Sequence, residues 1–181
     1  MNLQLKIYQP DKISSQDLVD IETFRFSDKQ HDDLIIDREY NPLSTYCVYY
    51  LDDVIVSTIK VMTKNSGTDI LPIEYAIKPN KSYFDVLNKF PVCEMGGLKI
   101  SENLSFKQKY VILNKTIREC TRQLILLKNK MIYVSCKESL ESMYTLKFGF
   151  NFETNVFYGD DKYSALSRPA NWVNTPWESK N

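Results

Sequence analysis

Short stretches that alternate hydrophobic and polar residues, or that concentrate β-branched and aromatic residues, predict β-strands along much of this chain. Turn residues separate two pairs of these stretches: Asp52-Asp53 in the first pair and Gly159-Asp160-Asp161 in the second. Each pair is therefore predicted to form a hairpin. The predicted strands cover residues 3–8, 45–51, 54–62, 92–100, 131–136, 150–158 and 162–168.

Hydrophobic residues that recur every three or four positions predict helices between the strands. Ser14 followed by Asp17 marks the start of the first helix, because a hydroxyl and an acid both suit a helix N-terminus. Ser105 and Gln108 form a capping box at the start of the longest helix, whose apolar stripe continues to Leu127. Two shorter helices are predicted, one at residues 83–90 and one that follows a second capping-box pattern at Ser135 and Glu138 and ends at Gly149.

The order of these elements predicts a mixed α/β fold. A strand, the long helix and a second strand follow one another, and such a unit requires a parallel crossover. The two hairpins add antiparallel pairs, one of them at the C-terminal end. A chain of 181 residues is typical of one domain. We therefore assign residues 1–170 to a single domain and residues 171–181 to a C-terminal tail.

Composition narrows the partners that this domain can bind. The chain has 23 Lys and Arg against 23 Asp and Glu, so it lacks the excess positive charge that attracts nucleic acids or membrane surfaces. Its single histidine, His31, excludes a zinc site built from several imidazoles, and no metal is predicted. No apolar run approaches the roughly 20 residues of a membrane span. The N-terminus lacks the pattern of a signal peptide, so a cytoplasmic location is predicted.

The four cysteines, Cys47, Cys93, Cys120 and Cys136, lie among apolar neighbours and form no C-x-x-C pair. Two interpretations are open. In the first, all four are buried, reduced thiols that act as small hydrophobic residues. In the second, Cys136 is a nucleophile with His31 as its base, although nothing in the local sequence supports that pairing.

The predicted strand at 92–100 has two unusual features. Adjacent glycines at 96 and 97 suggest a bulge, or the close approach of another backbone or of a ligand. Glu94 lies between Cys93 and Met95, and burial there would raise its pKa, which suits a general base near neutral pH. The alternative is a structural carboxylate held by backbone groups or by a basic partner.

Residues 139–150 read SLESMYTLKFGF. This segment resembles the "Y-x-K-x-G-F" motif of the GNAT acyltransferases, and residues 152–168 resemble the hairpin that ends the GNAT fold. Tyr144 lies one position earlier than the tyrosine of the motif, whose place is taken by Thr145.

Within GNAT-like proteins, residues 37–100 resemble the branch of acyl-homoserine-lactone synthases and long-chain N-acyl amino acid synthases. Three positions differ: Asn41 replaces an acid, Lys60 replaces an arginine, and Gly97 replaces the arginine of an "E-x-S-R" motif. Residues 101–110 contain no glycine, and the branch likewise lacks the glycine-rich pyrophosphate loop of acetyl-CoA enzymes. The matching segments are 39–42, 45–51, 56–60, 71–74 and 94–98.

The resemblance implies a single-domain GNAT-like mixed sheet and an N-acyltransferase, which moves an acyl group from a thioester to a small amine such as an amino acid. The donor would be acyl-CoA or the acyl-phosphopantetheine of an acyl carrier protein, used as a co-substrate without a covalently bound cofactor. The catalytic residues would be Glu94 and Tyr144. The strands at 92–100 and 131–136 would separate beside the glycines and leave a slot for the thioester.

The resemblance also implies binding residues for both substrates. A backbone N–H in the donor segment would face the thioester carbonyl. The start of the long helix would attract the phosphate of the donor, because its free N–H groups and dipole favour anions. The donor segment is Gly97, Leu98, Lys99 and Ile100, the helix start is Ser105, Phe106, Lys107 and Lys109, and the acceptor residues are Arg25, Asp37 and Lys60. For the lysines and for the acceptor residues, ordinary surface charge is the alternative.

A catalytically inactive binding protein with the same fold is the rival to an enzyme. The departures at Asn41, Gly97 and Tyr144 favour this rival. Binding of a thioester donor without turnover would distinguish it from an acyltransferase.

Overall fold

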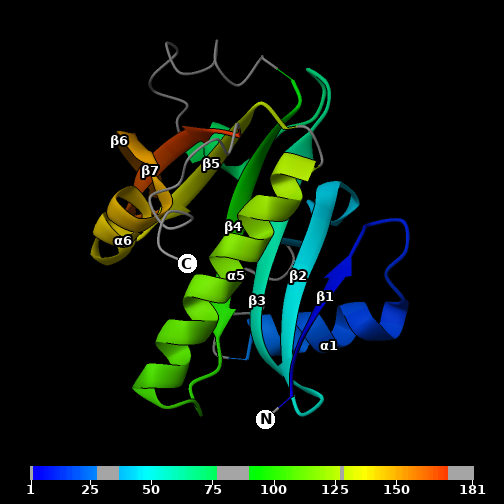
Figure 1. Ribbon diagram of the computed structural model, residues 1–181. Coiled ribbons are helices and arrows are strands. Elements are labelled where there is room, and N and C mark those ends of the chain that lie inside the picture. Colours follow the sequence, from blue (N-terminus) through cyan, green and yellow to red (C-terminus); the bar gives the residue numbers. More distant parts are fainter. Residues whose placement is uncertain (1, 28–36, 77–89, 127–128, 171–181) are drawn as a thin grey trace. The chain divides into compact units, whose positions relative to one another are not determined.

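The computed structural model describes residues 2–27, 37–76, 90–126 and 129–170. It is a mixed α/β structure whose seven strands follow the order β1-β2-β3-β4-β5-β7-β6 in the sheet (Figure 1). The strands are β1 (Leu3–Tyr8), β2 (Ser44–Leu51), β3 (Val54–Lys64), β4 (Val92–Ile100), β5 (Met131–Cys136), β6 (Asn151–Tyr158) and β7 (Asp161–Pro169). The helices are α1 (Ser15–Arg25), α3 (Pro72–Ala76), α5 (Phe106–Leu126) and α6 (Glu138–Phe148), with a 3-10 turn, η1, at Asn41–Leu43. This architecture confirms the predicted fold class.

The chain forms two compact units. Unit 1 comprises Met1–Met62 and Gly97–Cys120, and unit 2 comprises Thr63–Gly96 and Thr121–Asn181. Strand β4 therefore contributes its first five residues to unit 2 and its last four to unit 1.

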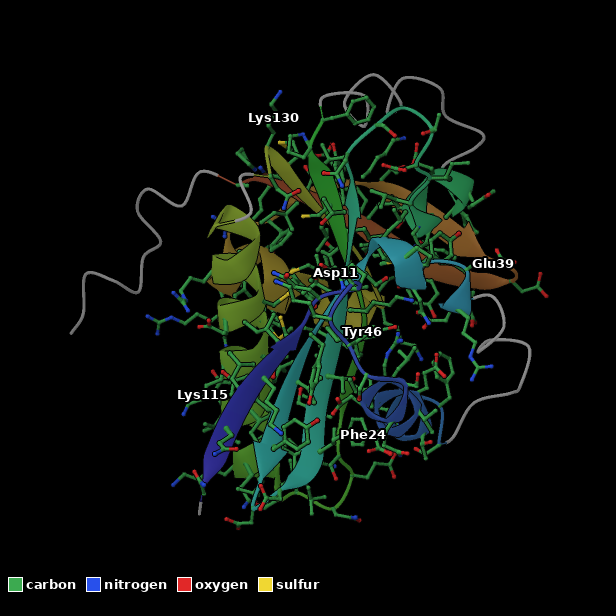
Figure 2. All side chains as sticks on the ribbon, turned by 90° about the vertical axis from the view of Figure 1, so that its right-hand side faces the viewer. Asp11, Phe24, Glu39, Tyr46, Lys115 and Lys130 are labelled. Atoms are coloured by element: carbon green, nitrogen blue, oxygen red, sulfur yellow. The ribbon has the colours of Figure 1, made fainter. Side chains whose placement is uncertain are left out.

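In unit 1, strands β1, β2 and β3 are antiparallel neighbours, and the predicted β2–β3 hairpin is confirmed. Its turn residues, Asp52 and Asp53, both have positive φ, of 48° and 66°, as a two-residue hairpin turn requires. Alternating side chains of β2 face two helices. Tyr46 packs with Ile21 of α1, whereas Tyr49 packs with Ile112 of α5. Figure 2 accordingly shows the two helices on opposite sides of these strands.

In unit 2, β4 runs parallel to β5, β5 is antiparallel to β7, and β7 forms the predicted hairpin with β6. The parallel pairing of β4 with β5 covers Val92–Met95 and Met131–Val134. Gly149 has a φ of 65° and ends α6 as the predicted left-handed cap.

One local prediction is wrong. Ser135 does not cap α6, because it lies inside β5, where it pairs with Ala165 of β7. The N-cap of α6 is instead Lys137, whose side chain makes no capping hydrogen bond. The short helix α3 was not predicted. The predicted helix at 83–90, apart from its last residue, and the tail at 171–181 lie outside the described residues. Across the described part of the chain, no helix has the length and hydropathy needed to cross a membrane.

Candidate active site

The predicted donor segment begins at an unusual backbone position. Gly97 has a φ of +59°, in the left-handed region that side chains with a Cβ rarely adopt. A Cβ built on Gly97 would lie 2.0 Å from Nη2 and 2.9 Å from Cζ of Arg25, the last residue of α1. Two independent constraints therefore require glycine here. The absence of the arginine that the synthase branch has at this place leaves room for the guanidinium of Arg25.

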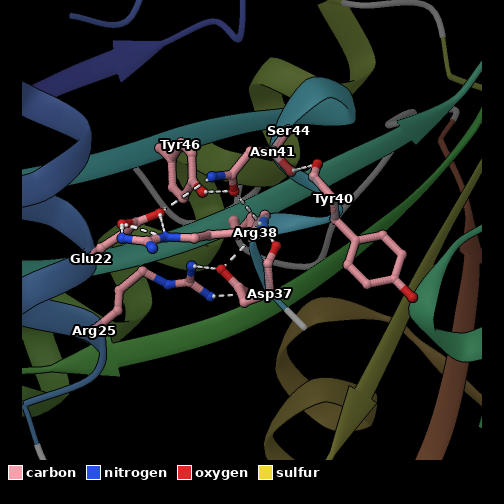
Figure 3. A network of polar contacts seen from close by, with 9 residues as sticks. Glu22, Arg25, Asp37, Arg38, Tyr40, Asn41, Ser44 and Tyr46 are labelled. Carbon is pink, nitrogen blue, oxygen red and sulfur yellow. Dashed lines mark hydrogen bonds and ion pairs between the residues drawn. The ribbon is translucent and has the colours of Figure 1, made fainter. Parts of the chain in front are cut away.

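Arg25, Asp37 and Lys60 lie together in unit 1, although they come from three separate segments. Figure 3 shows the contact between Arg25 and Asp37. Arg25 donates two hydrogen bonds to Asp37, with Nη1–Oδ2 at 2.6 Å and Nη2–Oδ1 at 3.1 Å. The Lys60 ammonium donates to Oδ2 of Asp37 at 3.1 Å and to its backbone carbonyl at 2.6 Å. The three predicted acceptor residues thus form one cluster, which is called the Asp37 cluster below.

Burial and charge set the ionisation of the Asp37 cluster. Burial by itself would raise the pKa of Asp37, but the hydrogen bonds and charge of Arg25, helped by Lys60, lower it. Burial lowers the pKa of Lys60 to about 8, even though the nearby Asp37 carboxylate raises it. Lys60 is only 1% exposed, so the alternative of ordinary surface charge is wrong for it.

A second layer of polar side chains surrounds the Asp37 cluster, and sequence reasoning did not assign it. Arg38 donates to Glu22 of α1, with Nη2–Oε2 at 2.7 Å. Asn41 donates to Glu22 at 3.2 Å and accepts from Tyr46 at 2.7 Å and from Lys60 at 3.0 Å. An amide can both donate to the carboxylate and accept from its other neighbours, whereas an ionised acid at this position could only accept. Glu22 lies about one helical turn before Arg25, and this spacing alone predicts that the two side chains share one face of α1.

A hollow of about 250 Å³ in unit 1 brings predicted donor and acceptor residues together. Arg25 is 4% exposed, and its Nε–H has no hydrogen-bond acceptor among the described residues. A buried donor without an acceptor is costly unless a ligand or water supplies one. The residues that line the hollow are Arg25, Phe26, Gly97, Leu98, Lys99, Ile100 and Glu102.

The start of α5 has the predicted capping box. The backbone N–H of Ser105 donates to the side-chain oxygen of Gln108 at 2.9 Å, and the N–H of Gln108 donates to the Ser105 hydroxyl at 3.4 Å. Phe106 is 86% exposed, Lys107 is exposed and Lys109 is half-buried. These positions leave the helix start accessible, and its role in phosphate binding stays a prediction.

Glu94 lies on β4 in unit 2 and is only 3% exposed. Its Oε2 accepts a hydrogen bond from the backbone N–H of Ile73 at 2.9 Å, and its Oε1 accepts from the Ser135 hydroxyl at 3.4 Å. Burial raises the pKa of Glu94 to about 7, and the negative charge of Glu74 adds to this effect. Hydrogen bonds from Ile73, Ser135 and Tyr158 act in the opposite direction. Sequence reasoning predicted the burial of Glu94 but not these partners.

Two other predicted chemical groups also lie in unit 2. Tyr144 is 2% exposed, and its ring packs against Phe148 and Phe150 at centroid distances of 6.0 Å and 5.5 Å. Burial raises the pKa of the Cys136 thiol to about 12, which opposes the thiolate that a nucleophile requires. His31 lies outside the described residues, whereas all four cysteines are free and buried, as the first interpretation predicts.

Comparison of the structure with solved structures identifies the architecture. FeeM, an N-acyl amino acid synthase from uncultured soil microbes, matches with a TM-score of 0.71 at 11% identity over 94% of this chain and 92% of FeeM. The chain has the GNAT fold. An acyl-CoA N-acyltransferase from Pseudomonas aeruginosa matches with a TM-score of 0.63 at 12% identity, over 92% of this chain and 99% of that protein.

The solved structures that share the GNAT fold with this chain include members of the predicted branch. The AHL synthase LasI matches with a TM-score of 0.61 at 12% identity, over 94% of this chain and 91% of LasI. No protein-family model and no curated protein sequence matches the chain. The resemblance predicted from sequence is therefore confirmed at the level of the fold.

Proposed function

We propose that this GNAT-fold protein is an N-acyltransferase that moves an acyl group from acyl-CoA or an acyl carrier protein to the amine of a small acceptor, such as an amino acid. The observation that carries the proposal is the raised pKa of the buried Glu94 carboxyl. A carboxyl group with a pKa of about 7 is poised to take up a proton near neutral pH. Three residues later on the same strand, Gly97 begins the segment that lines the hollow with Arg25.

The reaction forms one bond and breaks another. The acceptor nitrogen attacks the carbonyl carbon of the thioester while Glu94 takes a proton from that nitrogen. The oxyanion that develops accepts a hydrogen bond from a backbone N–H in segment 97–100, a contribution of roughly 2.7–4 kcal/mol in other oxyanion holes. The carbon–sulfur bond then breaks, and the leaving thiolate takes a proton from the Tyr144 hydroxyl, which regains a proton from water before the next turnover. The products are an N-acyl amine and a free thiol.

The binding residues suit these two substrates. Lys107 and Lys109, beside the exposed start of α5, would attract the phosphate of coenzyme A or of a phosphopantetheine arm. The Asp37 cluster and the unpaired Nε–H of Arg25 would hold the acceptor, and a carboxylate on the acceptor would satisfy that N–H. We place the reaction in the cytoplasm, because four free thiols fit a reducing compartment.

Thiol release tests the proposal directly. Purified protein is mixed with acyl-CoA and acyl carrier protein donors of short, medium and long chain length and with a panel of amino acids, and mass spectrometry identifies the N-acyl products. Glu94→Gln keeps the shape of the side chain but cannot take up the proton, so we expect turnover to fall by about 10²–10⁴-fold. Undiminished turnover in that variant would remove Glu94 from the mechanism.

The same panel separates an enzyme from an inactive binding protein. A donor at 100 times its Kd stabilises the folded protein by about 2.7 kcal/mol, which a thermal shift detects. Stabilisation by a donor without thiol release, with every acceptor tried, would favour the inactive binding protein.

A further inference from the structure

A base that is 3% exposed must still release its proton after each turnover. Glu94 has almost no contact with solvent, and its carboxyl accepts hydrogen bonds from the Ile73 backbone N–H and the Ser135 hydroxyl. Protons move between buried groups and solvent along connected titratable groups, hydroxyls or waters. The hydroxyls next to Glu94 supply such a connection.

Two hydroxyls extend from the Glu94 carboxyl toward the end of β6. The Ser135 hydroxyl lies 3.4 Å from Oε1 of Glu94, and the Tyr158 hydroxyl lies 2.9 Å from the Ser135 hydroxyl. Either hydroxyl of the Ser135–Tyr158 pair can donate, so this contact can carry a proton in either direction. Tyr158 is half-buried and is the last residue of β6, directly before the turn at Gly159. The two hydroxyls thus connect the buried carboxyl of Glu94 to Tyr158, which is partly exposed to solvent.

We propose that Ser135 and Tyr158 form a proton relay that returns Glu94 to its basic form after each acyl transfer. This inference rests on the proposed function, since it needs Glu94 to act as the base. In the relay, protonated Glu94 donates to the Ser135 oxygen, the Ser135 hydroxyl proton passes to the Tyr158 oxygen, and the Tyr158 proton passes to water. No bond other than those to hydrogen changes, and both hydroxyls return to their starting state when they rotate. The 3.4 Å separation is compatible with this role, because catalytic hydrogen bonds are often long before substrate binds.

The charged and titratable groups around Glu94 set the direction of any change in its pKa. Glu74, which is paired with Lys64 at 2.6 Å, raises the pKa of Glu94 through its charge. Cys93, its neighbour on β4, is a neutral thiol because burial raises its pKa. Hydrogen bonds from Ser135 and Tyr158 lower the pKa of Glu94, so the loss of either one raises it.

The relay is tested with Ser135→Ala and Tyr158→Phe, each of which removes one hydroxyl. Ser135→Thr is the matched control that keeps a hydroxyl at the same position. Tyr163→Phe is the control for Tyr158, because its ring contacts the Tyr158 ring at 5.3 Å while its hydroxyl is not part of the relay. We expect kcat to fall about tenfold in the two test variants. This loss is smaller than the roughly 10²–10⁴-fold loss expected when the general base itself is removed. The Tyr163→Phe control should stay within about twofold of the wild type.

Two further readouts separate a relay from a structural role. Ser135→Thr should recover most of the kcat that Ser135→Ala loses, because the threonine hydroxyl again links Glu94 to Tyr158. The acid limb of the pH profile, where activity rises as Glu94 loses its proton, should move to higher pH in both variants. Carbon NMR of the Glu94 carboxyl should report the same upward change in pKa without any substrate.

Each outcome has one meaning. Wild-type kcat in both variants, or a loss in Ser135→Ala that Ser135→Thr does not recover, overturns the relay while the proposed function stands. A wild-type protein that transfers no acyl group from any donor overturns the proposed function, and the relay with it. Ser135 and Tyr158 lie on different strands, so if one variant fails to fold, the other still tests the relay.

Discussion

The guanidinium of Arg25 occupies the space that a side chain on Gly97 would need, with Nη2 only 2.0 Å from the place of the missing Cβ. This relationship ties the end of α1 to β4 within unit 1. Glycine at position 97 therefore leaves room for Arg25 to bind the Asp37 carboxylate.

Gly97→Ala should destabilise the protein more than a change at a comparable glycine. Gly159 has nearly the same φ, +61°, but no atom lies within 4 Å of its missing Cβ, so Gly159→Ala measures the backbone cost alone. We expect that cost to be about 1–2 kcal/mol. Gly97→Ala should lose about 3 kcal/mol more, because the buried Arg25 must leave the half-buried Asp37 carboxylate. Urea unfolding measures both values. Equal losses, or the same loss for Gly97→Ala in an Arg25→Ala background, would contradict the clash.

Asp37→Asn should be among the most destabilising single changes at the Asp37 cluster. The variant leaves two buried cations, Arg25 and Lys60, without their shared carboxylate, and breaking a buried pair typically costs about 3–5 kcal/mol. The control is Glu138→Gln, which breaks an ion pair with Lys162 whose partners are 60% and 46% exposed. Exposed pairs contribute little, so this control should unfold at nearly the wild-type urea concentration. A loss in Asp37→Asn no larger than in the control would show that the cluster is not energetically coupled.

Stability should fall as pH rises through neutrality because of Glu94. The folded state holds the Glu94 pKa at about 7, above its ordinary value of 4.5, so the folded protein binds this proton more tightly than the unfolded chain does. The contribution is complete below pH 4.5 and is lost as pH rises to 7, a change of about 3 kcal/mol. Glu94→Gln cannot ionise, so the difference in unfolding free energy between this variant and the wild type should grow in favour of the variant over that range. A constant difference would mean that burial does not raise the pKa of Glu94.

Tyr144→Phe should separate the chemical role of Tyr144 from its packing. The ring contacts with Phe148 and Phe150 remain in this variant, so its unfolding free energy should change little. Tyr144→Ala removes the ring from a site that is 2% exposed and should cost about 3–5 kcal/mol. If the hydroxyl protonates the leaving thiolate, Tyr144→Phe lowers kcat, and donors with more acidic thiols are affected least. Unchanged kcat with every thioester would exclude Tyr144 as the proton donor.

Short sequence motifs predicted helices and strands correctly where no distant strand competed for the same backbone groups. The capping boxes show the limit of such signals. At Ser105 the side chain and Gln108 cap α5 as predicted, because only local backbone groups compete there. At Ser135 the same type of pattern failed, because the ladder to Ala165 had already taken the backbone into β5. The four residues of a capping motif cannot reveal a strand partner that lies thirty residues away along the chain.

The sequence by itself determined the fold class, the buried strand that carries Glu94 and the glycines that follow it, since periodicity and residue type encode burial and backbone freedom locally. Only the tertiary structure decided which charges meet: that Asp37 binds both Arg25 and Lys60, that Arg25 fills the space above Gly97, and that Glu94 faces two hydroxyls. The physical reason is that such contacts join side chains from distant segments, and their energies depend on distances that no linear pattern of residues records.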